Sequence, residues 1–135
     1  MNFVVKVIGR VESSLQRRED APKQGEEGAP LAVLVFEPEM QEALRDIRVG
    51  DPLILITWLD RADRTILSVH PRDDRARPKR GVFSTRSQDR PNPLGLHRVT
   101  VVSLLAPGRL QVSDLEALDQ TPIVDVKAAL PGRTE

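Results

Sequence analysis

The chain has no cysteine and only four aromatic residues, three phenylalanines and one tryptophan, among its 135 residues. Without cysteine there is no disulfide framework, so the reducing cytoplasm is the compartment we expect. Four aromatic side chains are too few for the stacking platforms that bind single-stranded nucleic acid. No apolar run approaches the ~20 residues that cross a bilayer, and the N-terminal MNFVVKVIGRV lacks the features of a secretory signal. We therefore expect neither a membrane-spanning nor a secreted protein.

Sequence motifs of several common enzyme classes are also missing. There is no GxGxxG after a strand and no GxxxxGK[ST], so the usual cradles for dinucleotides and nucleotide phosphates are not expected. No GxSxG motif surrounds a serine. His70 and His97 are the only histidines, and no carboxylates accompany them at a metal-ligand spacing, so we predict no metal site.

The net charge is zero, since 20 basic residues balance 20 acidic ones, and this disfavours a protein that coats nucleic acid by bulk charge. The charge is nevertheless unevenly distributed. Residues 72–98 contain eight Lys or Arg and three Asp. This local excess predicts a basic surface, and a solvated arginine-rich loop is the alternative interpretation.

Runs of β-branched and apolar residues predict strands, because such side chains fit a pleated surface better than a helix. The runs cover residues 3–12, 31–36, 51–59, 65–70, 81–85, 97–105, 109–116 and 123–126. One short helix is expected from Pro38, with apolar residues at helical spacing up to Ile47 and an end near Gly50. The polar stretch 13–30 should be a long loop.

Short linkers predict antiparallel hairpins, one between 51–59 and 65–70 and another between 97–105 and 109–116. We predict one mainly all-β domain over residues 1–135. Its expected architecture is a small antiparallel barrel of about seven strands with one short helix, in which closure removes free strand edges.

The loop RSQDRPNP at 86–93 contains two prolines within three residues. Arg90 and Asn92 each precede a proline, which restricts both to extended backbone, and the prolines themselves have a restricted φ. The loop is therefore stiff before any ligand binds, and Arg86 on it is suited to bidentate capture of a carboxylate or phosphate. A proline-locked corner with surface arginines is the alternative interpretation.

A second polar constellation is LDQTPIVDVK at 118–127, where Asp119, Thr121, Asp125 and Lys127 alternate with apolar residues. A strand there would present several polar groups on one face. A turn organised by Asp and Thr before a proline is the alternative.

These two segments resemble a known family. GVFSTRSQDRPNPLGL at 81–96 is similar to GVFATRSxxRPNPIGL, and LDQTPIVDVK is similar to LDGTPVLDIK, the two hallmarks of the TsaA-like (TrmO) tRNA methyltransferases. The similarity runs from about residue 5 to about residue 130. It implies a homodimeric β-barrel with S-adenosylmethionine in a cleft near the subunit interface. It also implies methylation of the exocyclic nitrogen of threonylcarbamoyl-adenosine beside the anticodon of certain tRNAs.

The resemblance also implies site residues. PKQ at 22–24 looks like the family's PRQ, whose following residues approach the cofactor. The expected cofactor-binding residues are Gly25, Glu26, Leu59, Asp60, Arg86, Arg90, Asn92, Leu96, Leu118, Asp119, Gln120 and Thr121. We expect tRNA phosphates to be held by Arg72, Arg75, Arg77, Lys79 and Arg80.

The chain departs from the family pattern at several positions. Gln120 replaces a glycine, His97 stands where many members have serine, and GEE follows PKQ where PGL is typical. The proton of the methylated nitrogen needs an acceptor, for which Asp60, Asp119, water and the substrate's own carboxylate all stay open. Two alternative functions also stay open: a methyltransferase of the same fold with another small-molecule or nucleic-acid substrate, and a non-catalytic S-adenosylmethionine-binding module.

Overall fold

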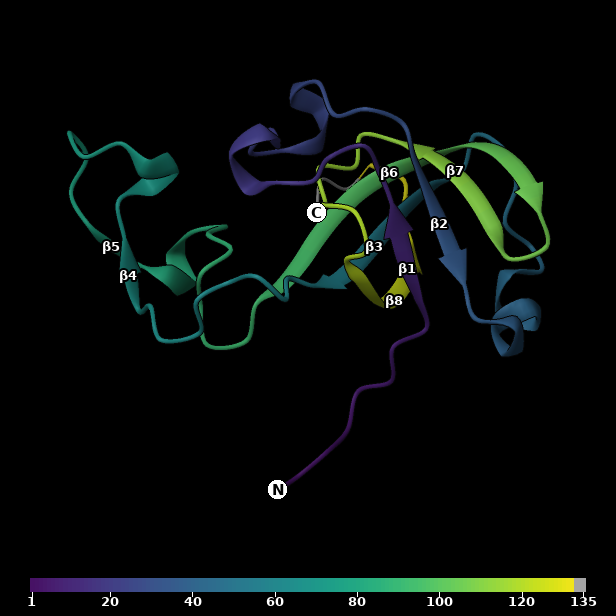
Figure 1. The fold of residues 1–135 in the computed structure, drawn as a ribbon, viewed down its shortest axis with the longest axis horizontal. Helices are drawn as coiled ribbons and strands as arrows, with labels where there is room; N and C mark the ends of the chain where they lie inside the picture. Colours follow the sequence, from purple (N-terminus) through teal and green to yellow (C-terminus); the bar gives the residue numbers. More distant parts are fainter. Residues whose placement is uncertain (133–135) are drawn as a thin grey trace.

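In the computed structural model, which describes residues 1–132, six antiparallel strands close into a barrel. The strands are β1 (Gly9–Glu12), β2 (Ala32–Phe36), β3 (Pro52–Trp58), β6 (Leu94–Ala106), β7 (Arg109–Ser113) and β8 (Pro122–Ala128). Their order around the barrel is β1-β2-β7-β6-β3-β8, and pairing of Gly9 with Ile123 joins the first strand to the last (Figure 1). The predicted fold class is confirmed. Residues 133–135 lie outside the described part.

The barrel interior is filled by alternate residues of its strands. Along β2, Ala32, Leu34 and Phe36 are buried while the residues between them are half-buried. This period of two places one face of each strand inside the barrel. Leu34, Leu55 and other completely buried side chains form one continuous core, and each contributes roughly 1.5–3 kcal/mol by leaving water.

The first predicted strand is shorter than expected. Only Gly9–Glu12 forms the strand, and residues 1–7 run away from the barrel as an extended segment (Figure 1). Phe3 and Val4 on it are 78% and 96% exposed. Residues 3–7 have strand-forming side chains, but backbone hydrogen bonds to the barrel begin only at Ile8, whose N–H donates to the carbonyl of Ile123 at 2.9 Å.

The predicted helix forms as a 3-10 helix, η3 (Pro38–Leu44), and not as an α-helix. Pro38 occupies the first turn as expected. Met40, Leu44 and Ile47, the apolar residues at helical spacing, are half-buried and pack against the barrel core.

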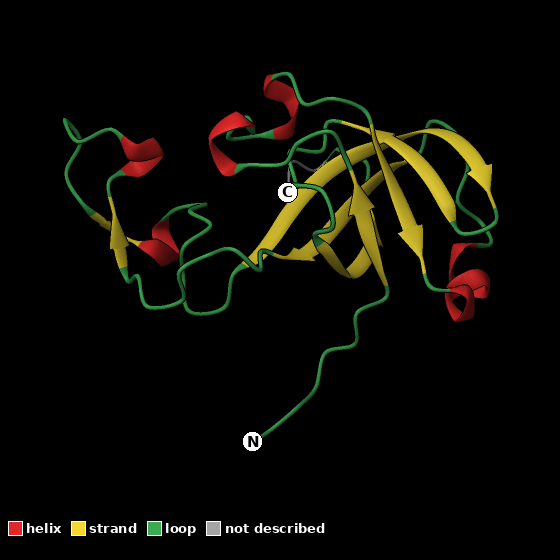
Figure 2. Cartoon of the chain, viewed as in Figure 1, coloured by secondary structure: helices red, strands yellow, loops and turns green. Residues whose placement is uncertain are grey.

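The hairpin predicted between 51–59 and 65–70 is wrong. Both edges of β3 are occupied, one by β6 and the other by β8, so no edge is left for residues 65–70. Instead β4 (Ser68–Val69) pairs with β5 (Arg80–Gly81) in a small sheet beside the barrel (Figure 2). The strand expected at 81–85 is mostly a 3-10 turn, η5 (Val82–Ser84).

The second predicted hairpin is confirmed, because β6 pairs with β7 across the turn at 107–108. Strand β6 begins three residues earlier than predicted, at Leu94, since residues 94–96 pair with the end of β3. The stretch 13–30 is a loop, as predicted, with two 3-10 turns, η1 (Arg18–Asp20) and η2 (Gly25–Glu27). Another 3-10 turn, η4 (Pro71–Asp73), follows β4. No helix formed by residues 1–132 is long and apolar enough to span a membrane.

A buried polar chain crosses the end of the barrel where β3 and β6 meet. Thr57 pairs in register with Gly95, and its Oγ1 lies 2.7 Å from Nε2 of His97. The other ring nitrogen of His97, Nδ1, is hydrogen-bonded to Oε1 of Glu116. A Cβ on residue 95 would fall 2.4 Å from Thr57 Oγ1 and 2.6 Å from His97 Nε2, so only glycine leaves room for this chain.

The Gly95→Ala variant should unfold with a free energy about 1–3 kcal/mol smaller than that of the wild type, because the added methyl forces apart a packed strand pair. Urea unfolding measures the loss. Gly81→Ala is the matched control, since nothing lies within 4 Å of a Cβ there and its backbone is extended. Equal stability of the two variants would contradict the packing described.

Gln120 adopts a φ of 68°, in the left-handed region that favours glycine. We expect Gln120→Gly to raise the free energy of unfolding by about 0.5–1 kcal/mol, because relief of the strained backbone exceeds the added chain entropy. Thermal unfolding tests this, with Gln120→Ala as a control that keeps the strain. A glycine variant no more stable than the alanine variant would show that the position is unstrained.

Candidate functional site

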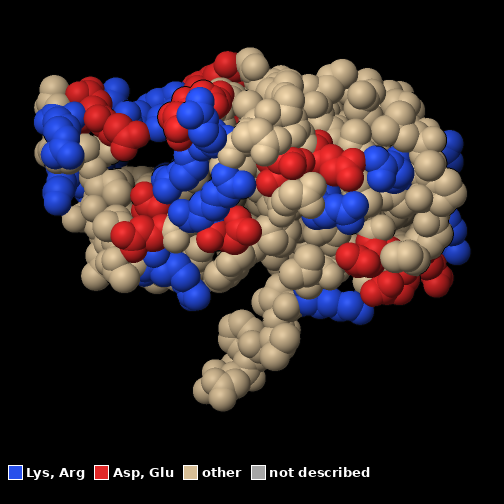
Figure 3. All heavy atoms as spheres, viewed as in Figure 1, with Lys and Arg blue, Asp and Glu red and all other residues tan. Residues whose placement is uncertain are grey.

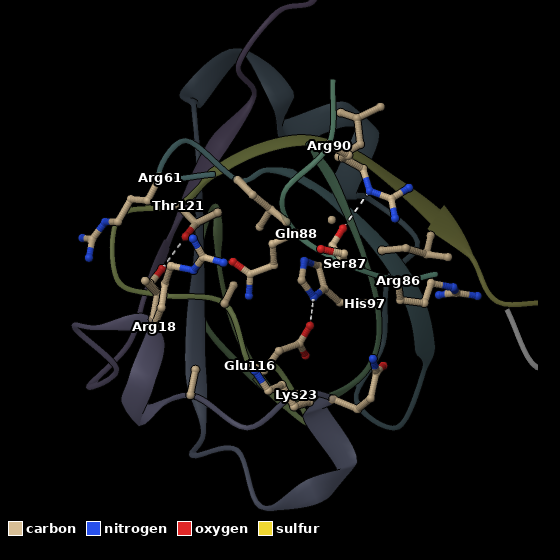
Figure 4. Close-up of a pocket in the computed structure, with 18 of the residues that line it drawn as sticks. Arg18, Lys23, Arg61, Arg86, Ser87, Gln88, Arg90, His97, Glu116 and Thr121 are labelled. Carbon is tan, nitrogen blue, oxygen red and sulfur yellow. Dashed lines mark hydrogen bonds and ion pairs between the residues drawn. The ribbon is translucent and has the colours of Figure 1, made fainter. Parts of the chain in front are cut away.

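A pocket of about 380 Å³ opens at the end of the barrel that carries the polar chain (Figure 4). The proline-containing loop supplies Arg86, Ser87, Gln88 and Arg90 to its wall. The 116–121 segment supplies Glu116, Ala117, Leu118 and Thr121. The structure thus brings together the two segments that the sequence analysis singled out, although 25 or more residues separate them in the chain.

The predicted cofactor residues divide into three groups. Seven line this pocket: Leu59, Asp60, Arg86, Arg90, Leu96, Leu118 and Thr121. Gly25 and Glu26 line an adjoining hollow of about 300 Å³, which shares Arg86 and Leu96 with the first. Asn92, Asp119 and Gln120 line neither hollow.

Arg90 holds the proline-containing loop together. Its guanidinium donates to three backbone carbonyls, those of Ser87 at 2.7 Å, Val82 at 2.9 Å and Thr85 at 2.7 Å. Backbone carbonyls in an irregular loop lack strand partners, and a charged donor satisfies them strongly. Arg90 therefore shapes the pocket wall through these bonds.

Asn92 has a similar supporting position on the outer side of the loop. Its Oδ1 accepts a hydrogen bond of 3.0 Å from Arg64, which also donates to the carbonyl of Pro91 at 2.7 Å. The Arg64 guanidinium lies 5.1 Å from the ring centroid of Trp58, within the range of a cation–π contact. The loop is thereby attached to the end of β3.

Asp119 attaches the long N-terminal loop to the barrel. Its Oδ1 accepts from the backbone N–H of Ser13 at 3.0 Å, and its own N–H donates to the carbonyl of Leu15 at 2.7 Å. Because the carboxylate is engaged outside the pocket lining, Asp119 is poorly placed to accept a proton from a bound substrate. Asp60 lines the pocket, is exposed, and makes no hydrogen bond with any described residue.

Most cations around the pocket already have partners. Arg18 forms two bonds of 3.3 Å with Asp89, Lys23 lies 2.8 Å from Asp73, and Arg61 donates to the carbonyl of Gln16 at 2.6 Å. The hydrogen bond from Lys23, and then its charge, lowers the pKa of Asp73 below its ordinary value.

Arg86 differs from these cations. Its side chain is exposed in the pocket and makes no hydrogen bond or ion pair with residues 1–132. It is therefore the arginine of the pocket wall that is available for an anionic ligand group. Among residues 1–132, no three His, Asp or Glu side chains lie close enough together to hold a metal ion.

His97 and Glu116 line the pocket but were not predicted as site residues. His97 was noted only as a departure from the family pattern. Strand alternation provides a signal for it, because Gly95 and His97 share the face of β6 opposite to the exposed Leu94 and Leu96. Glu116 lies just after the end of β7, and no sequence pattern marks it.

The residues predicted to hold phosphates lie on and around the small β4–β5 sheet, where Lys and Arg gather with acidic residues among them (Figure 3). Arg72 is paired with Glu27, with contacts of 2.7 and 2.9 Å, and Arg77 lies 3.6 Å from Asp74. The side chains of Lys79 and Arg80 are exposed and form no hydrogen bond or ion pair with other described residues. Arg75 is also exposed.

A second hollow, of about 320 Å³, lies between the basic residues and the pocket. Arg72 and Arg80 line it on one side and Ser87 and Gln88 on the other. Arg86 lines both this hollow and the main pocket, so the basic surface and the pocket are contiguous.

Comparison with known proteins identifies the family. A probable S-adenosyl-L-methionine-binding protein of Methanothermobacter thermautotrophicus is 38% identical over 94% of this chain and 90% of its own length. An S-adenosyl-L-methionine-binding protein of Archaeoglobus fulgidus is 36% identical over 96% of this chain and 91% of its own length.

Solved structures agree with this assignment. A crystal structure of TrmO matches 97% of this chain with a TM-score of 0.77 and 28% identity, and one from Pseudomonas aeruginosa matches 97% with a TM-score of 0.76 and 27% identity. This chain spans 59% and 57% of the lengths of those two chains. The model of the tRNA-methyltransferase O N-terminal domain matches residues 10–132. The chain therefore belongs to the TrmO family, as a relative of its N-terminal domain.

Proposed function

We propose that this protein methylates the exocyclic nitrogen of threonylcarbamoyl-adenosine beside the anticodon of tRNA. S-adenosylmethionine is the cofactor, in agreement with the family and with the names of the related binding proteins. The observation that carries the proposal is the pocket itself, in which both motif segments meet around an unpaired arginine and open toward a basic surface.

The pocket residues fit the cofactor in size and chemistry. A volume of about 380 Å³ lies within the ~300–1,000 Å³ of small-molecule sites. Arg86 would pair with the carboxylate of the methionine moiety, and Leu59, Leu96 and Leu118 would supply apolar surface for the adenine ring. The pocket is also lined by two acids, Asp60 and Glu116, which can attract the positively charged groups of S-adenosylmethionine. Its lining therefore suits a ligand that carries charges of both signs.

The chain's own contribution to methyl transfer is positioning. S-adenosylmethionine supplies an electrophilic methyl group on a positively charged sulfur. The stiff loop, braced by Arg90 and Asn92, presents a preformed wall against which cofactor and substrate can be aligned, and such alignment can contribute up to ~7–11 kcal/mol to catalysis. Asp60, with a carboxylate open to the pocket, is the residue we assign to accept the proton of the attacking nitrogen.

The basic surface gives the tRNA backbone a place beside the pocket. Lys79 and Arg80 are exposed and not engaged by the acidic residues that pair with Arg72 and Arg77. Phosphate contacts at these cations would place a nucleotide over the second hollow, next to Arg86.

A homodimer in the cytoplasm completes the proposal. Phe83 and Leu94 at the pocket rim are 83% and 48% exposed, and Leu67, whose carbonyl accepts a hydrogen bond from the N–H of Val82, is 68% exposed. Exposed apolar side chains of this size beside a site favour a protein interface there, which supports a cleft near the subunit boundary.

Mass spectrometry of tRNA nucleosides, with and without the protein and S-adenosylmethionine, tests the proposed reaction. We expect a methylated threonylcarbamoyl-adenosine only when all components are present, and no methyl incorporation into tRNA that lacks the threonylcarbamoyl group. Labelled methyl in tRNA irrespective of that group would indicate another substrate. Cofactor binding without any methylated product would indicate a binding module.

Arg86→Ala should weaken S-adenosylmethionine binding by roughly 10- to 100-fold, the value of one charge-assisted contact, while the thermal midpoint stays within about 2 °C. Calorimetry and thermal unfolding measure the two quantities. Arg75→Ala removes an exposed arginine outside the pocket and serves as the control. Unchanged affinity in the Arg86 variant would remove this residue from the cofactor site.

Combined Lys79→Glu and Arg80→Glu substitutions should weaken tRNA binding and lower the slope of log affinity against log salt by about 1–2, because about one counterion is released per phosphate contact. Filter binding at several salt concentrations measures both. Arg45→Glu with Arg48→Glu reverses two exposed cations near η3, away from the basic surface, and is the control. If both double variants have the same tRNA affinity and salt slope, Lys79 and Arg80 are only solvated surface residues.

A further inference from the structure

The buried polar chain ends on a carboxylate in the pocket. Thr57 is completely buried and His97 is 5% exposed, whereas the Glu116 side chain is 14% exposed and lines the pocket. His97 holds Oε1 of Glu116, and Oε2 makes no hydrogen bond with residues 1–132. Figure 4 shows His97 and Glu116 together toward the middle of the lining residues. One oxygen is thus held in place and the other is available.

The surrounding backbone is arranged to leave space at that second oxygen. Gly25, in the η2 turn, is buried, and a Cβ on it would lie 3.0 Å from Oε2 of Glu116. It would also collide with the carbonyl of Asp114 at 1.6 Å, so the turn can pack this closely only through glycine. Glu116 lines both the main pocket and the hollow beside this turn.

Glu116 is a mostly buried acid in a pocket whose charged residues are mainly cations. The main pocket is lined by five Lys or Arg and by two acids, Asp60 and Glu116. Asp60 is exposed to water, whereas Glu116 is mostly shielded from it. A shielded carboxylate attracts a nearby positive charge more strongly than an exposed one, because water screens it less.

We propose that Glu116, positioned by His97, recognises the positive charge on the sulfur of the cofactor. S-adenosylmethionine carries this charge, whereas S-adenosylhomocysteine, the product left after methyl transfer, is a neutral thioether at the same atom. Because of Glu116, the pocket binds S-adenosylmethionine more tightly than S-adenosylhomocysteine, which favours release of the product after methyl transfer. The inference rests on S-adenosylmethionine as the cofactor and not on the tRNA substrate.

Calorimetric titration of each form of the protein with S-adenosylmethionine and with S-adenosylhomocysteine tests this assignment without tRNA. We expect the wild type to bind S-adenosylmethionine roughly ten-fold or more tightly than S-adenosylhomocysteine. In Glu116→Gln, which keeps an oxygen for His97, the ratio should fall to within about three-fold of one, with little change for S-adenosylhomocysteine. Glu116→Asp keeps the charge and should retain most of the preference.

Three further comparisons separate recognition from a structural role. Glu42→Gln, on the exposed surface of η3, is the control and should keep the wild-type ratio. Sinefungin, which has an ammonium group in place of the methylsulfonium, should bind the wild type more nearly like S-adenosylmethionine than like S-adenosylhomocysteine, and this comparison needs no variant. His97→Asn, which frees Glu116 from the ring, should lower the ratio partly.

Equal weakening of both ligands in Glu116→Gln would overturn the proposal, since it would mean that Glu116 only supports the fold. A ratio near one in the wild type, or sinefungin binding no better than S-adenosylhomocysteine, would overturn it as well. If instead the ligand preference is as expected but no tRNA is methylated, the proposed substrate fails while the role of Glu116 stands.

Discussion

Pairing of β8 with β1 is the constraint on which the rest of the molecule depends, because it closes the sheet into a barrel. Closure gives a second neighbour to β1 and to β8, the two ends of the sheet order. Within the sheet, β3 lies between β6 and β8, so it has no free edge and residues 65–70 are excluded from the barrel sheet. That excluded segment then forms the small β4–β5 sheet beside the pocket. The basic surface therefore owes its position to the pairing of β3 with both β6 and β8.

The pocket shows how a small, charge-balanced protein can keep a few ionic groups available. Most of its cations are occupied by neighbouring acids or carbonyls, which order the walls, while Arg86 and the second oxygen of Glu116 are left open. The zero net charge of the chain conceals this arrangement, since exposed pairs contribute little to stability or to the field at a distance. Local availability of charge, and not its total, distinguishes the site.

Much of the fold followed from local pattern. Alternation in LAVLVF and the short turn after β6 predicted elements that the structure contains, and the helical spacing of Met40, Leu44 and Ile47 predicted a short helix, which forms as the 3-10 helix η3. Strand partners could not be predicted in the same way, because pairing is decided by closure and not by the composition of any one strand. The N-terminal FVVKV has strand-forming residues, but backbone hydrogen bonds to the barrel begin only at Ile8.

The site was predictable where the sequence imposes a conformation. The prolines on either side of Asn92 predicted a stiff loop. Gln120 stands where the family pattern has glycine, and its φ is indeed positive. His97 and Glu116 were not predicted, since their importance comes from a contact between β6 and the segment after β7 that no spacing reveals. Likewise the engagement of Asp119 by Ser13 depends on where the long loop crosses the barrel.

The scarcity of aromatic residues has a useful outcome at Trp58. It is the only indole in the chain, half-buried at the end of β3, and Arg64 above it also holds Asn92 of the proline-containing loop. Because the chain has no tyrosine, its ultraviolet fluorescence comes from one indole that lies against the cation bracing the proline-containing loop.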